Sequence, residues 1–151
     1  MNWRTVNLRI DYPGPITSFA DARNSFLKQL YKDEYVLFLS EDEEASLMLL
    51  KHLDKLEPSY PYYWIRRINL VHGRYVAWAN PDFEPQLVSS KVRFVGRLHE
   101  HVEPRKPHGT IDFPIIHNQN GQRSYDSGWK STSAYRPVLA AKRFLDVMKG
   151  R

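Results

Sequence analysis

Residues 35–44 read Tyr-Val-Leu-Phe-Leu-Ser-Glu-Asp-Glu-Glu, an apolar run that ends in four carboxylates. A short apolar, β-prone run bounded by polar residues is typical of a buried strand, so we expect a strand over residues 35–39. In open α/β sheets, ligands bind at the edge where such strands end. Clustered carboxylates repel one another there unless a cation lies among them. The stretch therefore indicates either a hard-metal site around Asp42 or an exposed acidic turn that begins the next helix.

The segments on either side of this run predict further strands and helices. The expected strands are 5–10, 35–39, 66–71, 74–78, 91–95 and 111–116. The expected helices are 18–32, 47–56 and 137–150, and the expected loops are 80–90 and 118–133. A turn at His72-Gly73 would join two of the strands into a hairpin. The pattern predicts one α+β domain over residues 1–151.

The composition restricts the classes of protein to which the chain can belong. It has 151 residues, 42% of them hydrophobic, which suffices for one domain with a proper core. It has no cysteine, so a disulfide framework, an iron–sulfur cluster and a thiolate zinc site are excluded. No apolar run is long enough to span a bilayer, so we expect a cytoplasmic protein without a transmembrane segment. The net charge of +5 favours anionic partners such as nucleotide phosphates.

Two further groups of residues could take part in chemistry. His99-Glu100-His101 follows the strand expected over residues 91–95, and a carboxylate between histidines can act as a general base or hold a metal. His117 closes the strand expected over residues 111–116 and could bind a metal or a phosphate. Each also has a plain structural interpretation, as a polar strand end and as a hydrogen-bonded histidine. Aromatic residues beside Arg66 and Arg67 allow nucleic-acid binding, but scattered basic residues and the acidic cluster count against it.

Taken in order, four segments resemble the family-2 glycosyltransferases, which have a GT-A fold. Residues 18–24, Ser-Phe-Ala-Asp-Ala-Arg-Asn, resemble the start of the family's Ala-Arg-Asn helix, and residues 35–43 resemble its strand ending in an Asp-x-Asp-Glu metal motif. Residues 81–87, Pro-Asp-Phe-Glu-Pro-Gln-Leu, are similar to its Pro-Asp-x-Gln-Leu segment. Residues 96–100 with 115–117 resemble its Gly-x-x-His-Glu and Ile-x-His pair.

The resemblance implies metal-dependent transfer of a sugar from a nucleotide diphosphate to an acceptor hydroxyl, with inversion. It implies that Asp42 binds Mn²⁺ or Mg²⁺, that His117 completes the metal shell or touches the diphosphate, and that Glu100 is the general base. The donor site is then expected to include the four residues Arg23, Asn24, Glu41 and His99. The implied fold is a GT-A-like mixed sheet flanked by helices.

The sequence departs from the family's pattern in two places. Ser40 stands where the first aspartate of the metal motif is expected, so Glu41 would have to serve beside Asp42. Only one expected strand precedes the helix 18–32, so we expect most of the first nucleotide-binding strands to be missing. Two hypotheses remain open: a transferase whose donor site is completed by a partner chain or a second copy, and a non-catalytic domain that binds a carbohydrate or a protein.

Overall fold

The computed structural model describes residues 1–80, 82–96, 100–105 and 107–118. Its strands are β1 (Asn2–Val6), β2 (Glu34–Phe38), β3 (Glu43–Ala45), β4 (Tyr62–Val71), β5 (Arg74–Tyr75), β6 (Asp82–Ser89), β7 (Arg93–Val95), β8 (His101–Glu103) and β9 (Gly109–Asn118). Its helices are α1 (Leu8–Asp11), α2 (Phe19–Leu27), α3 (Leu47–Lys55) and the 3-10 helix η1 (Ala77–Ala79). No helix in these ranges is long and apolar enough to cross a membrane.

The main sheet is mixed, with the strand order β1-β2-β6-β4-β9-β3 and with β5 paired to β4. Strand β1 is parallel to β2, and β4 is parallel to β9, whereas the remaining pairs are antiparallel. Strands β7 and β8 form a separate two-stranded sheet. The expected mixed sheet flanked by helices is therefore confirmed at the level of an α+β architecture.

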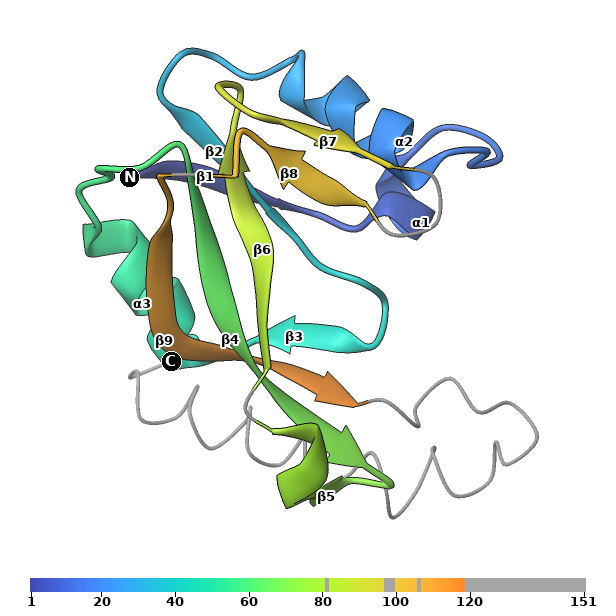
Figure 1. Cartoon of the computed structure of the whole chain (residues 1–151), viewed down its shortest axis with the longest axis vertical. Coiled ribbons are helices and arrows are strands. Elements are labelled where there is room, and N and C mark those ends of the chain that lie inside the picture. The colour runs from blue at the N-terminus through green and yellow to red at the C-terminus, as the bar shows by residue number, and fades with distance from the viewer. Residues whose placement is uncertain (81, 97–99, 106, 119–151) are drawn as a thin grey trace.

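Alternating side chains of β2 build a core on each face of the sheet. Val36 and Phe38 pack with α2, β7 and β8 on one face, and Tyr35 and Leu37 pack with α3 on the other. Successive residues of a strand point to opposite faces, so a run that is apolar throughout must be covered on both sides. Figure 1 shows α2 with β7 and β8 at one end of the sheet and α3 beside β9.

Local sequence signals explain where the two longer helices begin. The Ser18 hydroxyl accepts a hydrogen bond from the Asp21 N–H at 3.2 Å, and the Ser46 hydroxyl accepts one from the Leu49 N–H at 3.1 Å. Each serine satisfies one of the amide donors that the first turn of a helix leaves unpaired. Ser46 is the residue directly after β3, so α3 begins immediately after the strand that contains Glu43 and Glu44.

A turn at the end of β4 and a register shift in β9 determine the path of these strands. His72 and Gly73 have φ angles of 53° and 76° and form the turn between β4 and β5 that the His72-Gly73 sequence predicts. Strand β9 pairs with Ile65 through Ile111 and with Arg67 through Ile115, so the register shifts between them. Figure 1 shows β9 bending sharply along its length. The second half of β9 thereby runs on to pair with β3.

Some predicted elements are wrong or differ in extent. The strand expected over residues 5–10 ends at Val6, because the Asn7 side chain accepts from the Arg9 N–H at 3.1 Å and starts the short helix α1. The helix expected over 18–32 ends at Leu27. Residues 80–90 were expected to form a loop, yet β6 lies in the middle of the sheet. Its charged residues Asp82 and Glu84 pair with an arginine on β4. Of the loop expected over 118–133, Asn118 is the last residue of β9; the rest of that loop and the expected helix 137–150 lie outside the described residues.

Candidate functional site

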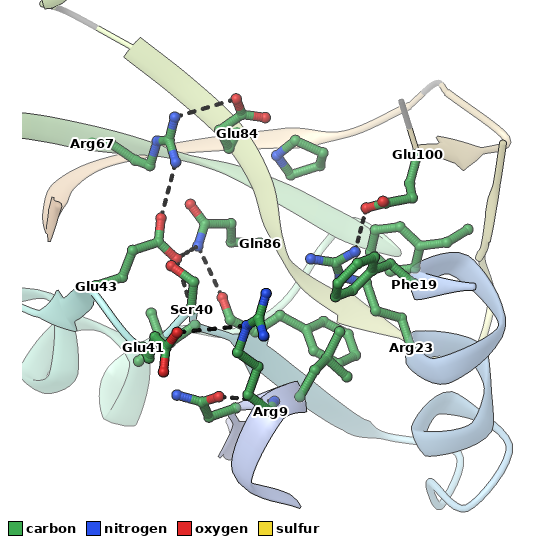
Figure 2. A pocket seen from close by; sticks show the side chains of 16 residues that line it. Arg9, Phe19, Arg23, Ser40, Glu41, Glu43, Arg67, Glu84, Gln86 and Glu100 are labelled. Atoms are coloured by element: carbon green, nitrogen blue, oxygen red, sulfur yellow. Dashed lines mark hydrogen bonds and ion pairs between the residues drawn. The ribbon is translucent and has the colours of Figure 1, made fainter. Parts of the chain in front are cut away.

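A cleft with a volume of about 230 Å³ opens at the carboxyl end of β2. Leu39, Ser40 and Glu41, which follow β2, line one side of it. The charged residues that line it are Arg9, Arg23, Arg67, Glu41, Glu43, Glu84 and Glu100. Figure 2 shows these groups as ion pairs around the cleft, with Gln86 near its centre. The cleft lies where the sequence predicts a ligand site, at the end of the buried strand.

Arg23 and Glu100 meet at this cleft, although 77 positions separate them in the chain. The Arg23 guanidinium donates to the Glu100 carboxylate and forms an ion pair with it. Its Cζ atom lies 5.3 Å from the ring centroid of Phe94 and 5.7 Å from that of Phe38. A guanidinium held between two rings loses little rotamer freedom when it pairs, so it fixes the carboxylate in place. The structure thus brings together two of the predicted site residues.

Asn24 lies beside Arg23 on α2 but is not among the residues that line the cleft. Its Nδ2 donates to the Phe94 carbonyl at 2.8 Å, and its Oδ1 accepts from the Phe94 N–H at 2.7 Å. These two bonds fasten α2 to β7, which explains the residue without a ligand. His99 lies outside the described residues.

Asp42 and His117 meet on the other side of the acidic segment. The register of β3 with β9 places Glu43 opposite His117, and His117 Nε2 lies 3.2 Å from Asp42 Oδ2. The Ser40 hydroxyl donates to Asp42 Oδ1 at 2.7 Å. Burial alone would raise the pKa of Asp42, but the hydrogen bonds from His117 and Ser40, with the charge of His117, outweigh it and lower that pKa. Both predicted metal ligands are therefore adjacent, although neither lines the cleft.

Asn69 determines which ring nitrogen of His117 faces Asp42. The Asn69 side chain, on a residue only 1% exposed, directs its Nδ2 to the Ala79 carbonyl at 2.8 Å and to Asp82 Oδ2 at 3.3 Å. Its Oδ1 lies 2.8 Å from His117 Nδ1 and can only accept a hydrogen bond. The network therefore assigns the Nδ1 proton, and it leaves Nε2 facing the carboxylate. Both ring nitrogens of His117 thus face acceptor oxygens, and Nε2 is the one that can share a proton or a cation with Asp42.

The chain supplies only part of a metal shell here. Within the described residues no group of three or more histidine, cysteine, aspartate or glutamate side chains converges. Glu41, expected to help Asp42, lies instead 3.6 Å from Arg9 at the exposed surface. Mg²⁺ and Mn²⁺ usually keep several waters and take oxygens from substrate phosphates. Asp42 and His117 are two adjacent donors of the kind that could bind such a cation, and they do not form a closed protein cage.

A partly buried ion-pair network that the sequence did not predict forms one wall of the cleft. Arg67 on β4 pairs with Asp82 and lies 3.0 Å from Glu43 and 3.5 Å from Glu84. Glu43 also accepts from Gln86 Nε2 at 3.1 Å, and Gln86 donates in turn to the Phe38 carbonyl. The network could have been predicted only by taking the segment of β6 as a strand paired with β4, because that pairing places Asp82 opposite Arg67. It was missed because residues 80–90 were expected to form a loop.

Glu84 shows how crowded with carboxylates this wall is. Burial raises the pKa of the Glu84 carboxyl, Arg67 opposes the rise, and the neighbouring Asp82 and Glu43 add to it. One arginine faces three carboxylates here, so the wall carries surplus negative charge. Such a surface favours a cation or a hydroxyl-bearing ligand over a bare anion.

No protein-family model matches the chain, and no curated protein shows a significant match to it. The geometry of the cleft and the resemblance in sequence are therefore the basis for a functional hypothesis.

Proposed function

We propose that this domain transfers a sugar from a nucleotide-diphosphate donor to an acceptor hydroxyl, with inversion at the anomeric carbon. The observation that carries the proposal is the Glu100 carboxylate, held by Arg23 at a cleft beside the carboxyl end of β2. A general base must lie in a fixed position within hydrogen-bond reach of the hydroxyl whose proton it takes. The ion pair with Arg23 provides that fixed position.

In the proposed reaction Glu100 accepts the proton of the acceptor hydroxyl. The oxygen of that hydroxyl attacks the anomeric carbon at the same time. The nucleotide diphosphate leaves from the opposite face of the sugar, and inversion follows. Asp42 and His117 would hold Mn²⁺ or Mg²⁺, which as a Lewis acid neutralises charge on the leaving diphosphate. Asn69 and Ser40 keep these two side chains oriented through the hydrogen bonds described above.

The proposal is tested first by ligand-dependent stability. Thermal unfolding of the full chain is measured with a panel of nucleotide sugars, with and without Mn²⁺. We expect one nucleotide to raise the melting temperature only when the metal is present, and Asp42→Asn to abolish that rise. Glu57→Gln, an exposed carboxylate away from the cleft, is the matched control and keeps it. No stabilisation by any nucleotide sugar with either metal would contradict transferase activity in the isolated chain.

The role of Glu100 needs a separate measurement. Glu100→Gln keeps the size of the side chain but cannot accept a proton, so turnover should fall at least about 100-fold. Nucleotide binding should fall less than turnover, because Asp42 and His117 keep their contacts even though Arg23 loses its ion pair. Nuclear magnetic resonance of the product's anomeric proton checks the inversion. Retained turnover in this variant would exclude Glu100 as the base.

A second candidate function is a non-catalytic domain that binds a carbohydrate or a protein. It is favoured by Ser40, which stands in the metal motif and donates to Asp42, and by Glu41, which pairs with Arg9 instead of joining Asp42. Binding of saccharides without turnover under every metal condition would support it. A donor site completed by a second copy or a partner chain predicts instead that turnover rises with protein concentration.

A further inference from the structure

A second hollow, of about 350 Å³, adjoins the cleft and has a different character. It lies between β4, β6 and the segment around β8, and it shares Glu84, Pro85 and Glu100 with the cleft. Its volume lies within the usual range for small-molecule sites. Glu100 therefore stands at the junction of the two spaces.

Aromatic rings line this hollow. The His108 ring centroid lies 5.6 Å from that of Trp64 and 5.4 Å from that of Tyr62, with interplanar angles of 38° and 40°. Flat, largely apolar surfaces of this kind bury the apolar face of a ring-shaped ligand.

Two polar atoms, on Trp64 and His108, have hydrogen-bonding capacity that a ligand could use, and the first becomes reachable only when neighbouring side chains shift. The Trp64 indole N–H is buried and has no hydrogen-bond partner among the described residues, which is costly unless something pairs with it. His108 Nδ1 lies 3.2 Å from the Gly109 carbonyl, which can only accept, so Nδ1 carries the proton. His108 Nε2 is then an acceptor. The hollow thus combines a donor, an acceptor and flat apolar walls.

We propose that this hollow is the acceptor pocket and that its ligand is a pyranoside. A pyranoside presents an apolar face of C–H groups to aromatic walls and hydroxyls that both donate and accept at its rim. A plain aromatic ligand would offer no hydroxyl to the carboxylates Glu84 and Glu100, and a phosphate-bearing one would meet these two carboxylates as well as Arg105. This inference rests on the proposed function, because it gives the pocket its place next to the base.

The test measures binding of methyl pyranosides to the full chain with no donor and no metal present. Methyl α- and β-glucosides, galactosides and mannosides are titrated while tryptophan fluorescence and saturation-transfer resonance are recorded. We expect at least one glycoside to bind saturably. Trp64→Phe, which keeps a ring but lacks the N–H, and His108→Ala should each weaken binding about five- to tenfold. Trp78→Phe, on a tryptophan that is 79% exposed and absent from the pocket lining, is the matched control.

Several outcomes would overturn the pocket assignment. One is equal affinity for the glycoside in the wild type, Trp64→Phe and His108→Ala. Another is that no glycoside binds at about 50 mM. A third is that only phenols or nucleosides bind. Circular dichroism of each variant shows whether it is folded. His108→Asn, a smaller change on a partly exposed residue, decides the matter if Trp64→Phe does not fold.

The pocket and the transfer reaction can fail independently. Glycoside binding that depends on Trp64 and His108, without any transfer, keeps the pocket as a saccharide site and contradicts the transferase. Transfer whose KM for the acceptor is unchanged in His108→Ala contradicts the pocket and leaves the transferase standing.

Discussion

Replacing Arg67 by methionine should cost more stability than any other single ion-pair change in the described part of the chain. Glu43 has a side chain only 4% exposed, and Arg67 is the cation in contact with it, at 3.0 Å. Without Arg67 the Glu43 carboxylate keeps the Ser40 N–H at 2.9 Å and Gln86 Nε2 at 3.1 Å, but no opposite charge. Breaking a buried pair from one side costs about 3–5 kcal/mol. That is a large part of the roughly 5–15 kcal/mol that a domain has.

Removing the charge of Glu43 should lower the free energy of unfolding less than removing Arg67 does. This difference between the two variants is the more specific prediction. Glu43→Gln leaves Arg67 with Asp82 and Glu84, so its charge stays compensated. The cost should be about 1–2 kcal/mol, the value of a changed hydrogen bond. The double variant Arg67→Met/Glu43→Gln should be more stable than Arg67→Met alone, because no buried charge is left unpaired.

Urea unfolding at about pH 7 gives these free energies. Arg66→Met is the matched control, since Arg66 is the neighbour on β4 and lies 3.9 Å from Asp112, whose side chain is 83% exposed; the change should cost under about 0.5 kcal/mol. The reasoning is refuted if Arg67→Met costs less than about 1 kcal/mol, or if the double variant is the less stable of the two.

Three further expectations concern residues away from that network. Asn24→Ala removes both hydrogen bonds to the Phe94 backbone and should cost about 2 kcal/mol in urea unfolding; an unchanged midpoint would mean that water replaces the side chain. The pKa of Asp42 is lowered in the folded state, so its stabilisation is present above the ordinary aspartate value near 3.9 and is lost as the pH falls through the folded value. Thermal unfolding between about pH 2 and 5 should therefore be less steep in Asp42→Asn than in the wild type, and equal slopes would contradict the shift. Gly109→Ala would place a Cβ 2.3 Å from Tyr63 Cε2, so it should destabilise by about 1–3 kcal/mol; a neutral result would mean that the Tyr63 ring moves aside freely.

The elements that the sequence predicts well are those whose signals are local. The apolar run over 35–39 becomes β2, the helix expected over 47–56 becomes α3, and His72-Gly73 turns β4 into β5. Each depends on a few adjacent residues whose periodicity or turn chemistry is visible without a partner.

Strand β6 shows why other elements could not be predicted. Its residues include Pro85 and charged side chains, which are depleted from strands, yet it lies between β2 and β4. The charges of Asp82 and Glu84 are offset by Arg67, whose position opposite them depends on the register of two strands distant in sequence. Asn7 is a second case, since its side chain starts a helical turn where alternation predicts a continuing strand.

For the site, the order of motifs was more informative than any single motif. The resemblance implied that His117 completes the metal shell of Asp42 or touches the diphosphate, and these two side chains are in contact. The contact between Arg23 and Glu100 was not predicted. Their catalytic and metal-binding roles remain predictions. The spacing of residues 40–44 could not show that Glu43 turns inward to Arg67 while Glu41 turns outward to Arg9.

The pairing of β3 with β9 has a consequence for the order in which the molecule assembles. Strand β3 lies at the edge of the sheet beside β9, and β9 pairs in parallel with β4 across a long intervening segment. During synthesis β4 and β6 can pair early, but Asp42 must wait for a histidine 75 positions later in the chain. Such distant contacts form late and slowly, because the loop must close before any contact rewards it. A nascent chain can therefore have most of its sheet in place before the Asp42–His117 pair exists.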